Sequence, residues 1–180
     1  MALLLLVLGL RLAGAQRFDP QAVVQRNYNM ARISGAWYSI SMASDNLTRI
    51  EEDGDLRVFI RNIEHLKNGS LKFDFHFMVQ GECVAVDVVC QKTDQNGEYS
   101  ISYQGENKVL VSETDYKTYV IFYMQNTNNG TQTRVLALYG RVSELSPIFQ
   151  HRFEKICKKY KLSAQNIMDL TQQDHCYSKR

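Results

Sequence analysis

Cysteine side chains carry most of the chemistry that this sequence could perform. Four occur, at Cys83, Cys90, Cys157 and Cys176. Thiols can form disulfides, bind metal ions or act as nucleophiles, and each role needs its own set of neighbours. The four histidines are scattered along the chain, at His65, His76, His151 and His175. Because no C-x-x-C pair accompanies them, the sequence predicts no metal site and no other cofactor.

The first fifteen residues indicate the compartment in which these thiols would lie. Met1 to Ala15 is almost unbroken Leu, Val and Ala with a single Arg11, and it ends in Ala13-Gly14-Ala15. This pattern predicts a secretory signal peptide over residues 1–15, too short to span about 30 Å of hydrocarbon. We therefore expect a secreted, extracellular single domain over residues 16–180, without stable membrane insertion. In such a protein the four cysteines can form up to two disulfides, in three alternative pairings.

Two further patterns concern the surface. Three N-x-S/T sequons, at Asn46, Asn68 and Asn129, are each placed at an expected loop. Behind a signal peptide they predict a glycosylated protein. The 21 basic and 19 acidic residues nearly balance, and basic residues cluster only between Lys155 and Lys161. The charge pattern therefore predicts no nucleic-acid partner.

Apolar and polar residues alternate over most of the chain, which predicts antiparallel strands joined by tight turns. The segments that show the pattern are 37–43, 56–63, 73–77, 83–91, 99–103, 108–111, 117–125 and 131–140. Three Asn-Gly pairs, Asn68-Gly69, Asn96-Gly97 and Asn129-Gly130, predict type I′ hairpins with positive φ at both turn residues. A slip in the alternation at Asn62 predicts a β-bulge.

An amphipathic helix is expected after the last strand. It begins at Ser146-Pro147, because proline suits the first helical position. Its apolar residues recur at helical spacing, at Phe149, Phe153, Ile156, Cys157 and Tyr160. The two preceding strands are apolar on both faces, so we expect the helix to cover their outer faces and to bury Cys157 as a free thiol. These patterns predict antiparallel β-structure plus one helix and leave both a barrel and a sandwich open.

Three short blocks follow one another along the chain: Gly35-Ala36-Trp37, Thr114-Asp115-Tyr116 and Tyr139-Gly140-Arg141. With the helix that follows, they resemble the signature of the lipocalins over nearly all of residues 16–180. The likeness is strongest to the epididymal lipocalins and to the odorant-binding and major urinary proteins. It implies an all-β fold, an eight-stranded antiparallel up-and-down β-barrel with one C-terminal α-helix outside. It also implies a Cys83–Cys176 disulfide and a cation–π contact between Trp37 and Arg141.

One face of the alternating segments is uncharged, and in a lipocalin barrel it would point inward. A barrel of eight strands can enclose one small ligand. The resemblance therefore implies a carrier of a small hydrophobic ligand, such as an odorant, a pheromone or a lipid-like molecule, with the hydroxyls of Tyr139 and Tyr103 as polar contacts. The expected ligand-binding residues are Leu56, Val58, Ile60, Phe73, Phe75, Val88, Ile101, Tyr103, Val109, Phe122, Met124, Val135, Ala137 and Tyr139.

Other lipocalin functions stay open at this point. A signalling protein could act through its surface on an unknown receptor, with its interior filled by aromatic rings. An enzyme of the prostaglandin-isomerase type would use a cavity cysteine, and Cys90 has inward parity. In that branch, however, the nucleophile is on the second strand, where residues 56–63 contain no cysteine, and no His or carboxylate accompanies Cys90. A carrier of metal complexes would need a basic residue inside, and Lys72 is expected to point outward. We therefore expect no enzymatic activity and no metal-complex carrier.

Overall fold

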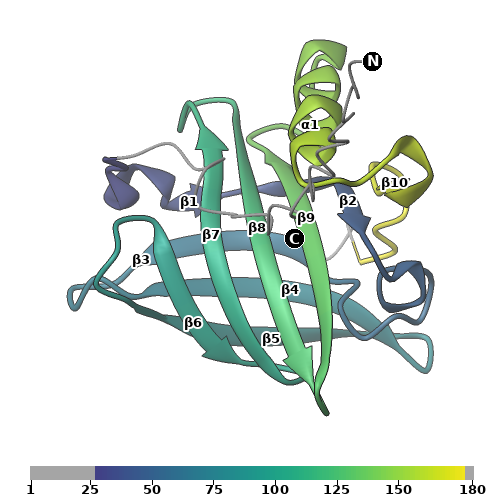
Figure 1. Cartoon of the computed structure of the whole chain (residues 1–180), viewed down its shortest axis with the longest axis horizontal. Coiled ribbons are helices and arrows are strands. Elements are labelled where there is room, and N and C mark those ends of the chain that lie inside the picture. The colour runs from purple at the N-terminus through teal and green to yellow at the C-terminus, as the bar shows by residue number, and fades with distance from the viewer. Residues whose placement is uncertain (1–26, 177–180) are drawn as a thin grey trace, which may run out of the picture.

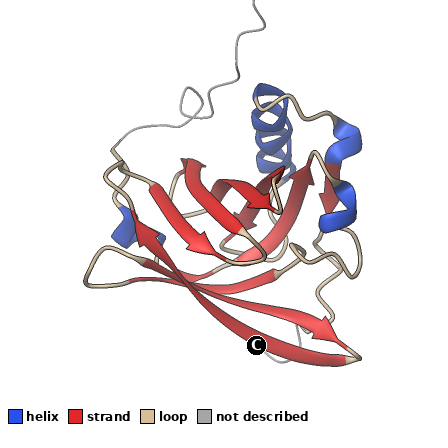
Figure 2. Ribbon diagram, turned by 60° about the horizontal axis from the view of Figure 1, so that its bottom comes forward, coloured by secondary structure: helices blue, strands red, loops and turns tan. Residues whose placement is uncertain are grey.

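Alternating apolar residues produce ten antiparallel strands that form one sheet, which curls into a barrel (Figure 1, Figure 2). This computed structural model describes residues 27–176, so the predicted signal peptide and the start of the domain lie outside the described residues. The strand order is β1-β3-β4-β5-β6-β7-β8-β9-β2-β10. The strands are β1 (Gly35–Ala36), β2 (Tyr38–Ser44), β3 (Phe59–His65), β4 (Leu71–Val79), β5 (Glu82–Lys92), β6 (Glu98–Ser102), β7 (Glu106–Thr114), β8 (Tyr119–Asn128), β9 (Thr131–Gly140) and β10 (Ile167–Asp169).

The first predicted strand, 37–43, corresponds to β2, and the two-residue strand β1 lies just before it, so that together they close the barrel. β1 pairs with β3, and β2, which follows after Trp37, pairs with β9 at the other end of the strand order. The backbone N–H of Trp37 donates to the carbonyl of Arg61, which holds the junction together. The predicted all-β barrel is confirmed, with ten strands rather than eight, because the two-residue β1 precedes the first predicted strand and the short β10 adds to β2.

The turns and the bulge follow the sequence in part. The register of β3 against β4 shifts between Ile60 and Asn62, which confirms the predicted bulge. At Asn129-Gly130 both residues have positive φ, 50° and 76°, as a type I′ turn requires. At the other two Asn-Gly pairs only the glycine has positive φ, so the prediction of type I′ turns there is wrong. At Asn68-Gly69 the loop is longer, because the N–H of residue 66 bonds to the carbonyl of residue 70.

The helix α1 (Pro147–Lys159) covers the outer face of the last two long strands (Figure 1). Tyr123 of β8 and Leu136 of β9 pack with Phe153 and Tyr160 of the helix segment. The rings of Tyr123 and Tyr160 stack with centroids 4.5 Å apart. The opposite faces of β8 and β9, including Phe122, belong to a separate apolar cluster inside the barrel. Each of the two apolar faces of β8 and β9 therefore has its own packing partner, the helix on the outside and the barrel core on the inside.

One end of the barrel is closed by Trp37, which is fully buried. The guanidinium of Arg141 lies 3.8 Å from the centre of the indole and donates to the carbonyls of Ala36 and Tyr116. Gly35 has φ +120°, and a Cβ there would lie 2.9 Å from Nη1 of Arg141, so this approach requires glycine. The cation–π contact between Trp37 and Arg141 is therefore present, as the resemblance implied.

Short single turns complete the described part of the chain. They are 3₁₀ turns, at η2 (Met30–Ile33), η3 (Leu47–Arg49) and η4 (Ala164–Asn166). In the range 27–176, no helix has the length and apolar composition to cross a membrane.

Candidate ligand-binding cavity

A cavity of about 90 Å³ lies inside the barrel, and most of its wall is apolar. Seven strands contribute to it, two further side chains come from the loop over residues 45–58, which joins β2 to β3, and Tyr103 comes from the turn between β6 and β7. Thirteen of the fourteen residues predicted to bind ligand border this space. They are Leu56, Val58, Phe73, Phe75, Val88, Ile101, Tyr103, Val109, Phe122, Met124, Val135, Ala137 and Tyr139. That they contact a ligand stays a prediction.

Ile60 is the predicted residue that does not border the cavity. It is fully buried in the same apolar cluster, next to the bulge in β3, and its neighbours cover it. Three other residues, Met42, Cys90 and Asn107, also line the space. The alternation of side chains could have identified Asn107, because it lies on the same face as Val109. The predicted strand, 108–111, began one residue too late to include it. Met42 could not be identified in this way. The last five residues of β2 are all buried, so the strand has no alternation of buried and exposed residues that would indicate its inner face.

Aromatic rings narrow the cavity. Phe73 stacks on Phe75 with ring centroids 5.7 Å apart, and Phe122 meets Phe73 edge-on at 5.4 Å. Tyr139 continues the row, 5.8 Å from Phe122. Sites for drug-sized ligands typically measure about 300–1,000 Å³, so the remaining space of about 90 Å³ suits a compact molecule. Aromatic side chains therefore fill part of the barrel interior, and a small cavity remains between them.

Two phenol groups are the available hydrogen-bonding partners in this apolar wall. Among the described residues, neither the hydroxyl of Tyr139 nor that of Tyr103 has a protein hydrogen-bond partner. Burial raises the pKa of both tyrosines, and the charge of Asp55 adds to the shift at Tyr103, so both stay protonated near neutral pH. Asn107 is different, since its amide already donates to the carbonyl of Tyr103 at 2.7 Å and accepts from Asn126. A ligand would therefore meet hydroxyl groups rather than charges.

Cys90 lies in the same wall, but its environment does not activate it. The thiol is buried, and burial raises its pKa to about 12. Among the residues that line the cavity there is no histidine and no carboxylate that could serve as a base. Cys157 is on the buried face of α1, and burial raises its pKa to about 12 as well. Neither thiol has the environment of a nucleophile.

We expect neither free cysteine to react with iodoacetamide in the native protein at pH 8. A thiol with a pKa of about 12 is ionised to only about one part in ten thousand at that pH. Mass spectrometry should find no added carbamidomethyl group under native conditions and two after unfolding in guanidinium without reductant. Cys90→Ala is the control and should show one group after unfolding. A native adduct at Cys90 would contradict this account of the cavity.

The other predicted side chains lie away from the cavity. Cys83 and Cys176 form a disulfide with Cα atoms 5.6 Å apart, which ties the C-terminal segment to β5. Lys72 is on the outer face, where its Nζ lies 3.5 Å from Glu64 and 3.8 Å from Asp74. In the part of the chain that the structure describes, no charged side chain lines the cavity.

The three sequons are all in loops or turns. Asn68 and Asn129 are exposed, and Asn46 is half-buried with its side-chain oxygen accepting from Thr48 at 2.6 Å. Their glycosylation stays a prediction. Over residues 27–176, no group of three or more His, Cys, Asp and Glu side chains is arranged to hold a metal ion.

Comparison with known proteins covers the whole region around the cavity. Residues 34–174 match the lipocalin / cytosolic fatty-acid binding protein family. The chain is 63% identical over 179 residues to epididymal-specific lipocalin-9 of Homo sapiens, across 99% of this chain and 93% of that protein. It is 38% identical over 177 residues to major urinary protein 4 of Mus musculus, across 98% of each. The crystal structure of the possum milk whey lipocalin trichosurin with bound 4-ethylphenol matches with a TM-score of 0.74 and 30% identity, over 78% of this chain and 98% of that one.

Proposed function

This chain belongs to the lipocalin / cytosolic fatty-acid binding protein family, and on that premise we propose that it is a secreted carrier of a small hydrophobic ligand. The observation that carries the proposal is the apolar cavity inside the barrel, with two free hydroxyl groups in its wall. Burial of apolar surface contributes about 25 cal/mol per Å², which supplies the affinity. A hydroxyl then orients one polar atom of the ligand. The ligand leaves unchanged, because none of the described residues that line the cavity is an activated nucleophile.

The size of the cavity favours a compact ligand. Trichosurin was solved with 4-ethylphenol, a small aromatic molecule with one hydroxyl group. The space of about 90 Å³ between Phe73, Phe75 and Phe122 is suited to a molecule of that kind. We therefore favour odorant-like or pheromone-like molecules with one polar atom over long lipids.

Secretion and glycosylation are part of the same proposal. The apolar start of the chain supports export, and the disulfide between Cys83 and Cys176 is typical of an oxidising compartment. The three sequons at surface loops support glycosylation in that compartment. We propose no nucleic-acid partner and no stable membrane insertion. A cell-surface receptor would be a partner in addition to the small ligand.

A signalling protein that acts through its surface is the second candidate. The row of rings from Phe75 to Tyr139 favours it, because these rings occupy much of the interior. The two candidates differ in one observable, which is uptake of small apolar molecules. An occluded barrel would take up none.

Native mass spectrometry of the protein purified from a secreting cell line tests the proposal. We expect a co-purifying small molecule, or saturable binding of added 4-ethylphenol that displaces an environment-sensitive apolar dye. A barrel that takes up neither the dye nor 4-ethylphenol would favour the surface-acting protein instead.

Tyr139→Phe should weaken the binding of 4-ethylphenol by about 2- to 12-fold, since one hydrogen bond contributes roughly 0.5–1.5 kcal/mol. The ring stays in place, so binding of ethylbenzene, which has no hydroxyl group, should not change. Dye competition measures both affinities, and Tyr103→Phe is the matched variant at the other hydroxyl. An equal loss for both ligands would mean that the hydroxyl of Tyr139 acts through the shape of the cavity.

A further inference from the structure

A short segment separates the inner cavity from a groove on the outside of the barrel mouth. In residues 55–58, Leu56 and Val58 line the inner cavity, whereas Asp55 and Arg57 line an outer groove of about 320 Å³. Val58 and Tyr103 border both spaces. Residues 55–58 are therefore a partition, with the cavity on one side and the groove on the other.

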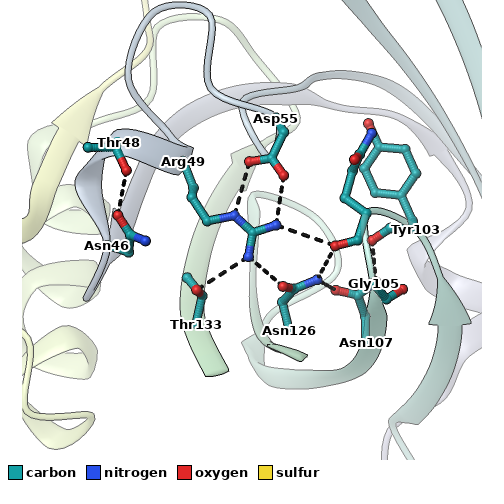
Figure 3. Close-up of polar contacts among 10 residues, drawn as sticks. Asn46, Thr48, Arg49, Asp55, Tyr103, Gly105, Asn107, Asn126 and Thr133 are labelled. Carbon is teal, nitrogen blue, oxygen red and sulfur yellow. Dashed lines mark hydrogen bonds and ion pairs between the residues drawn. The ribbon is translucent and has the colours of Figure 1, made fainter. Parts of the chain in front are cut away.

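Arg49 holds this partition in place (Figure 3). Its guanidinium forms a bidentate ion pair with Asp55, at 3.0 Å from Nε and 2.7 Å from Nη2. Its backbone carbonyl accepts the N–H of Leu56 at 2.9 Å. The partition is thus bonded to both the side chain and the main chain of one residue.

The same guanidinium is fixed to the barrel wall. It donates to the side chains of Asn126 on β8 and Thr133 on β9, and to the carbonyl of Gln104 (Figure 3). Asn126 is fully buried and donates to Gln104 at 3.0 Å and to Asn107 at 2.8 Å. Because Asn107 lines the cavity, one unbroken set of hydrogen bonds joins the partition to the wall of the site.

The other attachments of the loop do not reach the partition in this way. Arg57 donates to the carbonyl of Ile50 at 3.0 Å, which is a contact inside the loop. Asp45 pairs with Arg134 at the start of the loop, and Ile50 is fully buried as an anchor. Loss of the Arg49 side chain should therefore remove the polar connection between residues 55–58 and the barrel wall, which leaves this segment held by the main-chain bond of Leu56 and by apolar packing, while the loop stays folded on the barrel.

We propose that Arg49 is a specificity-determining residue, which limits the ligand to compact molecules by holding residues 55–58 across the mouth. With the guanidinium in place, a ligand is confined to about 90 Å³. Without it, the cavity and the outer groove join between Val58 and Tyr103. An extended chain can then run from the cavity along the apolar side of the groove, which Phe77 and Val79 form, although the opposite side is polar. This inference rests on the proposed carrier function, because it concerns the size of the same ligand.

A series of unbranched alkan-1-ols from hexanol to dodecanol tests the inference by competition with a bound apolar dye. In the wild-type protein, affinity should stop rising once the chain outgrows the cavity. In Arg49→Gln it should keep rising, at up to about fourfold for each added methylene that is buried. We expect the ratio of dodecanol to hexanol affinity to be at least about tenfold larger in the variant, while hexanol affinity changes by less than about threefold.

Asp55→Asn is the second variant, in case Arg49→Gln fails to fold, and it should shift the length profile in the same direction. Arg152→Gln is the matched control, because Arg152 of α1 forms a bidentate ion pair with Glu113 far from the mouth. It should lower the melting temperature and leave the length profile unchanged. An unchanged profile in folded Arg49→Gln and Asp55→Asn would overturn the inference, as would the same change in Arg152→Gln. A wild-type protein that binds no hexanol would instead overturn the carrier function itself.

Discussion

Replacing Ala137 by Trp is expected to abolish ligand uptake. Ala137 lines the cavity from β9, where it lies opposite Phe122 on one side and Met42 on the other. An inward indole at this position is about as large as 4-ethylphenol, so it would fill the cavity of about 90 Å³ that a ligand needs. We therefore expect the affinity for the dye and for 4-ethylphenol to fall by at least about a hundredfold, as measured by fluorescence titration.

Added volume in a packed interior typically costs about 1–3 kcal/mol, so the melting temperature of Ala137→Trp must be measured alongside binding. Val142→Trp is the matched control, because it adds the same indole at a side chain that is 53% exposed. Its uptake should equal that of the wild-type protein. If folded Ala137→Trp still takes up dye at wild-type affinity, the ligand binds elsewhere.

Trp37→Ala should cause the largest loss of stability, about 3–5 kcal/mol in the free energy of unfolding. The indole is fully buried, its Nε1 donates to the carbonyl of Ile33 at 2.7 Å, and Arg141 packs over its face. Alanine would leave a cavity and would remove the surface on which the guanidinium lies. Domains of this size are stable by about 5–15 kcal/mol in total, so the loss would be a large fraction.

Urea unfolding followed by circular dichroism measures this loss, because the variant lacks the tryptophan that fluorescence would report. Trp37→Phe is the graded variant and should cost less, since a ring remains beneath Arg141. It also gives a value if Trp37→Ala does not fold. A loss below about 1 kcal/mol for Trp37→Ala would show that this end of the barrel is closed by other contacts.

The closed end and the mouth depend on arginine in different ways. Arg141 donates to main-chain carbonyls and covers an aromatic ring, and burial lowers its pKa. Arg49 pairs with a carboxylate, and the hydrogen bond from Arg49 holds the pKa of Asp55 below its ordinary value, although burial opposes the shift. The first arrangement stabilises the fold, whereas the second is placed where it can restrict the ligand.

The sequence by itself determined the fold class and the sides of most strands. Alternation with a period of two specifies which residues share a face, and together with the resemblance to the lipocalins this was enough to place Phe73, Phe122 and Ala137 around one interior. Two adjacent strands with two apolar faces, followed by a helical stripe, predicted that Phe153 and Tyr160 would cover the outside. Because these patterns are local, they can be recognised without knowledge of the contacts.

Only the tertiary structure decided the depth, the volume and the mouth of the site. The alternation of side chains places Ile60 and Phe75 on one face of the sheet. Only the packing of the folded chain shows that neighbouring side chains cover Ile60, whereas Phe75 borders the cavity. Residues 56–58 were predicted as strand, yet they belong to the loop that crosses the mouth. Arg49 carries no signal in the sequence, because its partner Asn126 lies 77 residues away. Periodicity records the direction of a side chain, whereas volume and long-range hydrogen bonds depend on how distant segments meet.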